Sequence, residues 1–237
     1  MEDEVARIAE NVARVRGRIA EAAARSGRAP SHVTLVAVTK YVPADMVRPL
    51  VAAGCLDLGE SRPQQLWEKA AALSDLPIRW HLIGHLQRNK VRRTLPLLTM
   101  VHSVDSPRLL AAMDEECAAP LPVLLEVNVS GEAAKHGFPP ETIKPFLAHR
   151  AGCRHVSLRG LMCMAGLEGG LETARRDFSA LRALRDRLRP HCPPGVRLDQ
   201  LSMGMSGDFE VAIEEGATIV RVGSALFEGI ESAIPNP

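Results

Sequence analysis

A single lysine, Lys40, ends a run of apolar and β-branched residues and could carry covalent chemistry. The run 33–39 is continuous rather than alternating, which is typical of a strand buried on both faces of a parallel sheet. Pro43 then opens a helical pattern, so the strand would end at the lysine. Parallel α/β folds place their reactive groups at such strand ends. Most lysines simply lie in solvent, but an amine held there among apolar neighbours can lose its proton and attack an aldehyde.

Two glycine-containing segments near the C-terminus have the composition of phosphate-binding loops. Residues 201–207, Leu-Ser-Met-Gly-Met-Ser-Gly, combine small side chains with two hydroxyls and precede a helical pattern whose first N–H groups would point at an anion. Residues 221–224, Arg-Val-Gly-Ser, add a guanidinium, a glycine and another hydroxyl. Ordinary glycine turns would explain the same pattern. Barrels, however, frequently bind phosphate with the loops after their last two strands.

The elements that must position these residues are short apolar strands that alternate with helical segments. An amphipathic helix over 4–25 comes first. Eight strands are predicted at 33–39, 56–59, 78–83, 100–104, 123–129, 156–162, 197–201 and 218–222. This alternation, without a Gly-x-Gly-x-x-Gly motif, predicts one α/β domain over 1–237, a single (β/α)8 TIM-type barrel with residues 1–28 as an extra N-terminal helix packed on it. A doubly wound open sheet is the competing architecture.

Closure of such a barrel would make the eighth strand a neighbour of the first. Lys40 and the two predicted phosphate loops would then share one rim. An amine beside a phosphate site is the arrangement that holds pyridoxal 5′-phosphate as a Schiff base. A sugar-phosphate enzyme of ordinary barrel type, with Lys40 forming a Schiff base to its substrate, fits the same residues.

The composition excludes several classes of partner. The 237 residues carry a net charge of +1 and only 3% aromatic residues, which argues against a nucleic-acid surface. Hydrophobic residues make up 46%, yet no apolar run is long enough to span a bilayer, and the acidic N-terminus does not resemble a signal peptide. The five cysteines form no Cys-x-x-Cys pair. We therefore expect a soluble cytoplasmic protein with free thiols and no membrane or nucleic-acid partner.

A set of motifs, taken in order, resembles the YggS/PROSC family of pyridoxal phosphate homeostasis proteins. The motifs extend from the first strand to near the C-terminus, and their order makes the resemblance specific although no single motif would. They are Val38-Thr39-Lys40, Gly59-Glu60, residues 80–90 (Trp-His-Leu-Ile-Gly-His-Leu-Gln-Arg-Asn-Lys), Asn128, Lys135-His136-Gly137, residues 158–162 (Leu-Arg-Gly-Leu-Met), 201–206 and 221–223.

The resemblance implies a barrel that holds pyridoxal phosphate on Lys40, with the phosphate end near the last two strands. It supplies the other candidate cofactor-binding residues: Ser202, Ser206, Arg221, Gly223 and Ser224 around the phosphate, and Ser61, His81, Asn128, Met162, Met203 and Gly204 elsewhere in the site. Ser61 is a departure, since the family commonly has asparagine there, and a hydroxyl would replace any asparagine contact. Two positions are open for Arg221, at the phosphate or at the pyridine nitrogen.

Other polar features have simpler interpretations. His81 and His85 have the spacing of a zinc-protease motif but lack its glutamate and fall on a strand and a turn, so we expect no zinc site. His81 is expected either to line the cavity near the cofactor or to be a hydrogen-bonded core histidine. The basic run 88–93 is expected as a solvated helix face. Glu126 and Asn128 share one face of the fifth strand, whose inward or outward sense the pattern leaves open.

The predicted role is that of a carrier rather than an enzyme. Related barrel enzymes, such as alanine racemase and ornithine decarboxylase, add a β-domain that supplies an acid or base across a dimer, and we expect no such domain here. Tyr41, the single tyrosine, should point to the face opposite Lys40 if strand geometry continues that far. We therefore expect a monomer that binds pyridoxal phosphate reversibly and delivers it to apo-enzymes. The alternative is a racemase-like amino-acid enzyme in which Lys40 moves the proton.

Overall fold

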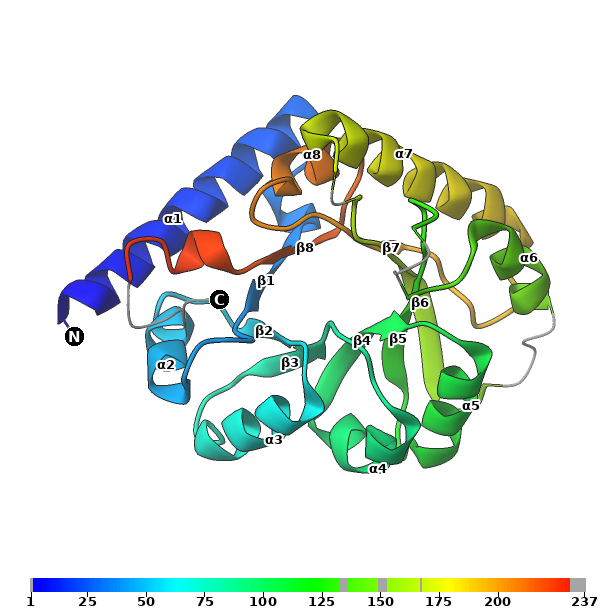
Figure 1. The fold of residues 1–237 in the computed structure, drawn as a ribbon, viewed down its shortest axis with the longest axis horizontal. Helices are drawn as coiled ribbons and strands as arrows, with labels where there is room; N and C mark the ends of the chain where they lie inside the picture. The colour runs from blue at the N-terminus through cyan, green and yellow to red at the C-terminus, as the bar shows by residue number, and fades with distance from the viewer. Residues whose placement is uncertain (1, 133–135, 149–152, 167, 231–237) are drawn as a thin grey trace.

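Eight parallel strands close into a barrel in the order of the chain (Figure 1). The computed structural model describes residues 2–132, 136–148, 153–166 and 168–230. The strands are β1 (Thr34–Val38), β2 (Asp57–Glu60), β3 (Arg79–Leu82), β4 (Leu98–Val104), β5 (Leu121–Glu126), β6 (Val156–Met162), β7 (Gln200–Ser202) and β8 (Ile219–Val222). Because β1 pairs with β2 on one side and with β8 on the other, the sheet has no open edge there. The predicted (β/α)8 barrel is confirmed, and an open doubly wound sheet is excluded.

Helices surround the barrel on its outside (Figure 1). They are α1 (Glu2–Arg25), α2 (Ala44–Ala52), α3 (Pro63–Ala72), α4 (Val91–Thr94), α5 (Pro107–Glu116), α6 (Pro140–Ala148), α7 (Gly170–Leu188) and α8 (Phe209–Glu214). Proline begins α3 and α5, where its missing N–H would have no partner within the helix. Ser106 Oγ caps α5 by accepting the Leu109 N–H at 3.3 Å. Among the helices described, none has both the length and the apolar character needed to cross a membrane.

The N-terminal helix α1 packs along the outside of the barrel beside α8 and α2 (Figure 1). Its apolar stripe is buried, with Ile8 and Val15 fully inaccessible to solvent. Arg18, on the flank of that stripe, donates to both carboxylate oxygens of Glu210 in α8, at 3.0 and 2.9 Å. The helix therefore covers the side of the barrel where β8 meets β1.

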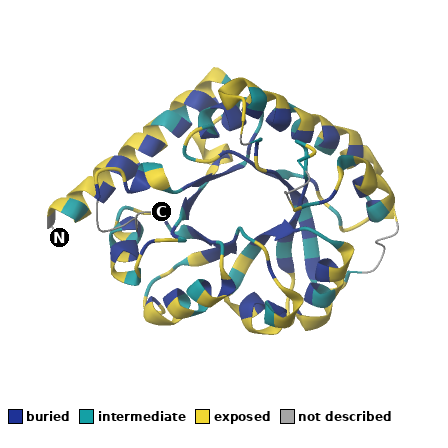
Figure 2. Cartoon of the chain, in the orientation of Figure 1, coloured by how far each residue is buried: buried dark blue, intermediate teal, exposed yellow. Residues whose placement is uncertain are grey.

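Buried apolar side chains form two groups, a small one of strand residues alone inside the barrel and a large one that also includes residues of the helices. Figure 2 shows buried positions along the strands and on the helix faces turned toward them. Because side chains alternate along a strand, the interior group shows which residues point inward. Arg221 follows Ile219 by two residues and Glu126 follows Leu124 by two, so both side chains also point into the barrel. The face of the fifth strand that carries Glu126 is therefore the inner one. The interior group consists of Val36, Leu124, Met162 and Ile219, with Met100 packed against it.

The bounds of two strands differ most from the prediction. The fifth strand was predicted over 123–129, but β5 ends at Glu126. The chain turns into a loop there, because the Asn128 side chain donates to the Glu132 carbonyl and accepts the Gly131 N–H. The seventh strand was predicted over 197–201, but β7 comprises only Gln200–Ser202, the residues that pair with β6. The other strands lie within two residues of their predicted bounds.

Candidate functional site

Lys40 lies two residues beyond the end of β1, at the carboxyl end of the barrel, and is partly buried. Its Nζ is 4.9 Å from the centre of the Tyr41 ring, within the range of a cation–π contact. The expectation that Tyr41 points to the opposite face is wrong, because β1 ends at Val38 and the alternation of a strand does not reach residue 41. Tyr41 is 51% exposed, so the amine and its aromatic neighbour lie at an open mouth.

The end of β1 is held by a buried ion pair outside the barrel wall. Glu60, the last residue of β2, is fully buried and pairs with Lys69 of α3. Thr39 Oγ donates to Glu60 Oε1 at 2.7 Å, and Lys69 Nζ donates to the Thr39 carbonyl oxygen. These contacts hold the residue immediately before Lys40. The sequence prediction missed Lys69, because the pattern of α3 does not tell which of its charged residues turns toward the sheet.

The loop after β8 lies against the end of β1, as barrel closure predicts. The pairing register places Ala37 opposite Val222. One residue further on, a Cβ atom added to Gly223 would lie 3.4 Å from the Val38 Cβ. The last strand therefore delivers its loop to the rim that carries Lys40.

The loop after β7 supplies a hydroxyl that the backbone already orients. Ser206 Oγ accepts the N–H groups of Gly223 at 3.1 Å and Ala225 at 3.5 Å. With its lone pairs engaged, this hydroxyl has its hydrogen left to donate. Gly204 makes the turn possible, because its φ of +93° favours glycine and a Cβ there would lie 2.5 Å from the Ala212 Cβ. The two loops thus lie against each other and leave the Ser206 hydroxyl hydrogen available to an anion at the rim.

Arg221 points into the barrel interior next to these loops and is only 4% exposed. Its guanidinium donates to Ser202 Oγ at 2.6 Å and to the Cys163 carbonyl oxygen at 2.9 Å. Burial lowers the pKa of this guanidinium, and the charges of Glu126 and Asp208 oppose that shift. Within the described ranges no carboxylate forms an ion pair with it, so the site contains a fixed positive charge.

Three further predicted residues lie close to these elements in the fold. Met203 is buried, and its N–H donates to the Ile219 carbonyl oxygen at 3.1 Å. Met162 belongs to the apolar group inside the barrel. Ser224 is exposed at the start of the short 3₁₀ turn η5 (Ser224–Leu226) that follows β8. The two methionines therefore belong to the barrel itself, whereas the serine is free to meet a ligand at its rim.

Ser61 and Asn128 are engaged in packing and loop contacts. Ser61 directly follows β2 and packs against Gly84, where a Cβ would lie 2.4 Å from the Ser61 carbonyl oxygen. The Asn128 amide donates to the Glu132 carbonyl at 2.9 Å, and its oxygen accepts the Gly131 N–H at 3.0 Å. The Asn128 side chain is thus committed to its own loop.

His81 of β3 lies inside the barrel and is hydrogen-bonded on both sides. Its Nδ1 is 2.9 Å from Nε2 of His102 in β4, and its Nε2 is 3.0 Å from Oδ1 of Asp57 in β2. His102 in turn lies 2.8 Å from Ser202 Oγ. The prediction allowed for a core histidine but missed His102 and Asp57. The signal was available for His102, since a histidine within the predicted strand 100–104 needs a polar partner if that strand is buried.

A second polar group lies at the ends of β3 to β5. His85 Nδ1 is 2.8 Å from Asp105 Oδ2, and the His85 ring stacks on His136 with centroids 5.0 Å apart. Their candidate ligand atoms all lie within 4.8 Å of one another, so this group, among the residues described, could hold a divalent cation. The His85–Asp105 hydrogen bond accounts for the arrangement without an ion. Burial, with the Asp105 charge, raises the pKa of the nearby Glu126 carboxyl.

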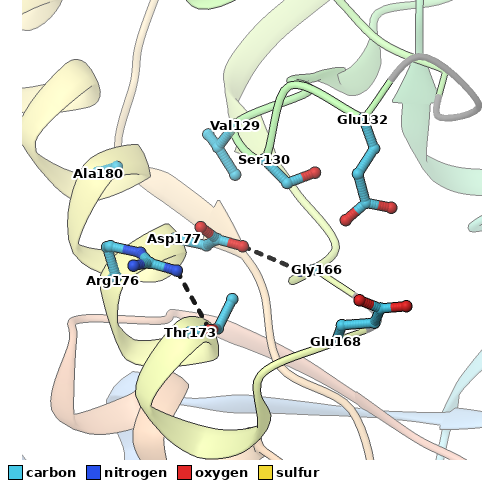
Figure 3. A pocket seen from close by; sticks show the side chains of 9 residues that line it. All are labelled: Val129, Ser130, Glu132, Gly166, Glu168, Thr173, Arg176, Asp177 and Ala180. Atoms are coloured by element: carbon cyan, nitrogen blue, oxygen red, sulfur yellow. Dashed lines mark hydrogen bonds between the residues drawn. The ribbon is translucent and has the colours of Figure 1, made fainter.

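A cleft of about 630 Å³ opens between the loop after β5 and the start of α7 (Figure 3). Ser130 and Glu132 lie on one side of it, and Asp177 of α7 lies on the other. The Asp177 carboxylate accepts the Gly166 N–H at 2.9 Å and is thereby fixed. The residues predicted to bind a cofactor, all of which the structure describes, do not line this cleft. The candidate site is therefore the rim that carries Lys40.

Known protein sequences match this chain along nearly its whole length. The family model for the N-terminal domain of alanine racemase matches residues 5–230. A pyridoxal phosphate homeostasis protein of Pseudomonas aeruginosa is 43% identical over 231 residues, which cover 96% of this chain and 98% of that protein. Another from Aquifex aeolicus is 40% identical over 221 residues, covering 92% of this chain and 96% of that protein.

Solved structures extend the comparison to three dimensions. PipY from Synechococcus elongatus, solved with pyridoxal phosphate bound, matches with a TM-score of 0.81 and 35% identity, over 93% of this chain and 99% of that one. The alanine racemase of Corynebacterium glutamicum matches with a TM-score of 0.72 and 16% identity, over 98% of this chain and 64% of that one. At that identity the second likeness shows the fold alone.

Proposed function

Because this chain belongs to the YggS/PROSC family of pyridoxal phosphate homeostasis proteins, we propose that it binds pyridoxal 5′-phosphate covalently through Lys40. The observation that carries the proposal is the shared rim. The amine follows β1, the first predicted phosphate loop follows β7, and the second follows β8, the strand that pairs with β1. The bound pyridoxal phosphate in PipY, a relative of 35% identity, supports the same ligand.

The residues on this rim fit the chemical groups of the cofactor. Ser206 has a hydroxyl hydrogen left for a phosphate, and Gly223 has no side chain to fill the space beside it. Bound pyridoxal phosphate supplies an aldehyde, which a primary amine can attack. We assign Lys40 as the anchor, Ser206, Gly223 and Ser224 as the phosphate cradle, and Arg221 as the buried charge that orients the ligand.

The same site suits storage and delivery better than turnover of amino acids. The mouth beside Lys40 is open to solvent, given the 51% exposure of Tyr41, whereas carbanion chemistry needs water excluded and a positioned proton donor. None of the described cysteines is joined in a disulfide bond, which suits the reducing cytoplasm as the place of action. The proposed recipients are apo-enzymes that require pyridoxal phosphate, and the proposed active form is a monomer.

The first test is the visible spectrum of the purified protein with added pyridoxal phosphate. We expect a Schiff-base band and, after borohydride reduction, an adduct on the peptide that contains Lys40. Lys40→Ala should lose both signals, whereas Lys144→Ala, which removes an exposed lysine of α6, should keep them. No band and no adduct on the wild-type protein would remove the cofactor assignment and favour the sugar-phosphate enzyme.

Delivery is tested by mixing the loaded protein with an apo-enzyme while a phosphatase destroys any free pyridoxal phosphate. Recovery of the apo-enzyme's activity would support direct transfer, and no recovery would show that the cofactor is released first. Incubation with L- and D-alanine tests the enzyme alternative on the same preparation. Steady conversion that disappears in Lys40→Ala would overturn the carrier role.

A further inference from the structure

Five polar side chains form a hydrogen-bonded chain across the inside of the barrel, called here the interior chain. Its contacts run from Asp57 Oδ1 to His81 Nε2 (3.0 Å), from His81 Nδ1 to His102 Nε2 (2.9 Å), from His102 Nδ1 to Ser202 Oγ (2.8 Å) and from Ser202 Oγ to Arg221 Nη1 (2.6 Å). The last four residues are at most 4% exposed, and the Asp57 side chain is 16% exposed. The interior chain links the amino end of β2 to the proposed cofactor rim.

The arginine end of the interior chain indicates which group donates and which accepts at each of its hydrogen bonds. A guanidinium can only donate, so Ser202 Oγ accepts from Arg221 and has its own hydrogen to donate to His102 Nδ1. Burial lowers the pKa of His102, and the neighbouring His81 and Arg221 lower it further, so its ring is neutral. A neutral imidazole with an accepting Nδ1 carries its hydrogen on Nε2. His102 therefore donates to His81 Nδ1.

The aspartate end is consistent with the same direction. Burial alone would raise the pKa of the Asp57 carboxyl, but hydrogen bonds from Arg79 and His81 outweigh it and lower that pKa. A carboxylate can only accept, so His81 Nε2 must donate to Asp57. The hydrogen that His102 donates goes to His81 Nδ1, which leaves Nε2 as the His81 atom that carries a hydrogen for Asp57. Each link has one donor and one acceptor, and the two ends meet without conflict.

We propose that the interior chain positions the Arg221 guanidinium for the cofactor, an inference that rests on the proposed function. His81 and His102 are both held as the tautomer with hydrogen on Nε2. Ser202 commits its single hydroxyl hydrogen to His102 and uses a lone pair to hold Arg221. Ser202 is thus a positioning residue with no hydrogen for the phosphate, and donation to the phosphate falls to Ser206.

The tautomers can be tested in the protein without cofactor. Nitrogen-15 NMR of the histidine rings at pH 7 should show both His81 and His102 as neutral Nε2–H forms, with signals assigned through His81→Gln and His102→Gln. A charged ring or an Nδ1–H tautomer at His102 would overturn the interior chain. This readout does not depend on whether pyridoxal phosphate binds.

The Asp57 end of the interior chain can be tested with Asp199 as a matched control. Asp57 accepts Arg79 through both carboxylate oxygens at 2.8 and 2.6 Å, and Asp199 accepts Arg159 in the same way at 3.2 and 2.7 Å. Of these two aspartates, Asp57 also contacts a histidine, His81, whereas the described contacts of the Asp199 side chain are with Arg159. Asp57→Asn should therefore produce a second histidine tautomer and raise the dissociation constant for pyridoxal phosphate about threefold, and Asp199→Asn should do neither. Equal effects of the two variants would contradict the proposal.

The near end is tested by a double-mutant cycle. Ser202→Ala should raise the dissociation constant for pyridoxal phosphate about tenfold, and Ser202→Thr, which keeps the hydroxyl, should stay within about threefold of the wild type. In an Arg221→Gln background, Ser202→Ala should change it less than about twofold, because the serine acts through the arginine. A tenfold loss that persists there would mean direct contact with the phosphate and would overturn the positioning role. Failure of the wild type to form an adduct on Lys40 would instead overturn the proposed function.

Discussion

Two buried cations near the carboxyl end of the barrel are compensated in different ways. Lys69, outside the barrel wall, contacts the carboxylate of Glu60 and the Thr39 carbonyl oxygen. Arg221, inside the wall, is held by the hydroxyl of Ser202 and a carbonyl oxygen, and none of the ion pairs found in the described residues includes it. The fold neutralises the charge of the lysine and leaves that of the arginine in place.

This difference in charge compensation distinguishes a residue that supports the fold, Lys69, from one at the proposed binding site, Arg221. A neutralised pair only has to hold the end of β1, and it does so through Thr39, one residue before Lys40. A buried guanidinium held by neutral groups costs stability but remains able to attract an anionic ligand. Such local conflicts with stability are expected where a protein binds its ligand.

Removing the lysine should have the largest effect on stability. Lys69→Met would leave the Glu60 carboxylate buried without its counter-charge, and we expect a loss of about 3–5 kcal/mol in the free energy of unfolding. Urea denaturation measures the loss, and Arg159→Gln, which breaks a more exposed pair, should cost far less. The double variant Lys69→Met/Glu60→Leu should recover most of the stability. A single variant as stable as the wild type would show that the pair does not support the fold.

Removing the arginine should act on binding rather than on stability. Arg221→Gln should leave the free energy of unfolding of the cofactor-free protein within about 1 kcal/mol of the wild type, or raise it, because a costly buried charge disappears. The dissociation constant for pyridoxal phosphate should rise at least about tenfold, or about 1.4 kcal/mol. Urea denaturation and absorbance titration measure the two quantities. A stability loss as large as that of Lys69→Met would abolish the contrast between the two cations.

The loss of stability at low pH tests the carboxylate of Asp57, at the end of the interior chain away from Arg221. The pKa of Asp57 is lowered in the folded protein, so its contribution to stability is present above the usual carboxyl pKa and is lost as the pH falls below it. Asp57→Asn should therefore flatten the decline in unfolding free energy between about pH 5 and pH 2. Urea denaturation at a series of pH values measures this decline. An unchanged slope would mean that the pKa of Asp57 is not lowered in the folded state.

The smallest expected effect on stability comes from Glu126, whose pKa shift is opposite in sign to that of Asp57. Burial raises the pKa of Glu126, so its contribution is greatest below the usual carboxyl pKa and is lost as the pH rises through the raised value. Glu126→Gln should therefore increase the unfolding free energy at pH 7 to 8 relative to the wild type, with little change at pH 4. A decrease at pH 7 to 8 would show that the Glu126 carboxylate compensates Arg221, and the arginine would then resemble Lys69.

The sequence by itself determined the barrel and the ends of its reactive strands. Continuous β-branched runs predict buried parallel strands because each such strand is covered on both faces, and this local signal located all eight strands. Lys40 could be placed because strand and helix signals bracket it, and the glycines and serines of 201–207 could be placed because turns have a local chemistry. Closure of the barrel then followed from the repeat of strand and helix.

Only the tertiary structure decided which polar groups meet. The interior chain joins residues of β2, β3, β4, β7 and β8, and its partners depend on which face of each strand points inward and how far neighbouring strands are staggered. The Glu60–Lys69 pair depends on the rotation of α3 against β2. Tyr41 turned toward Lys40 because β1 ended at Val38. Such contacts are set by packing between distant segments, and no periodicity along the chain records them.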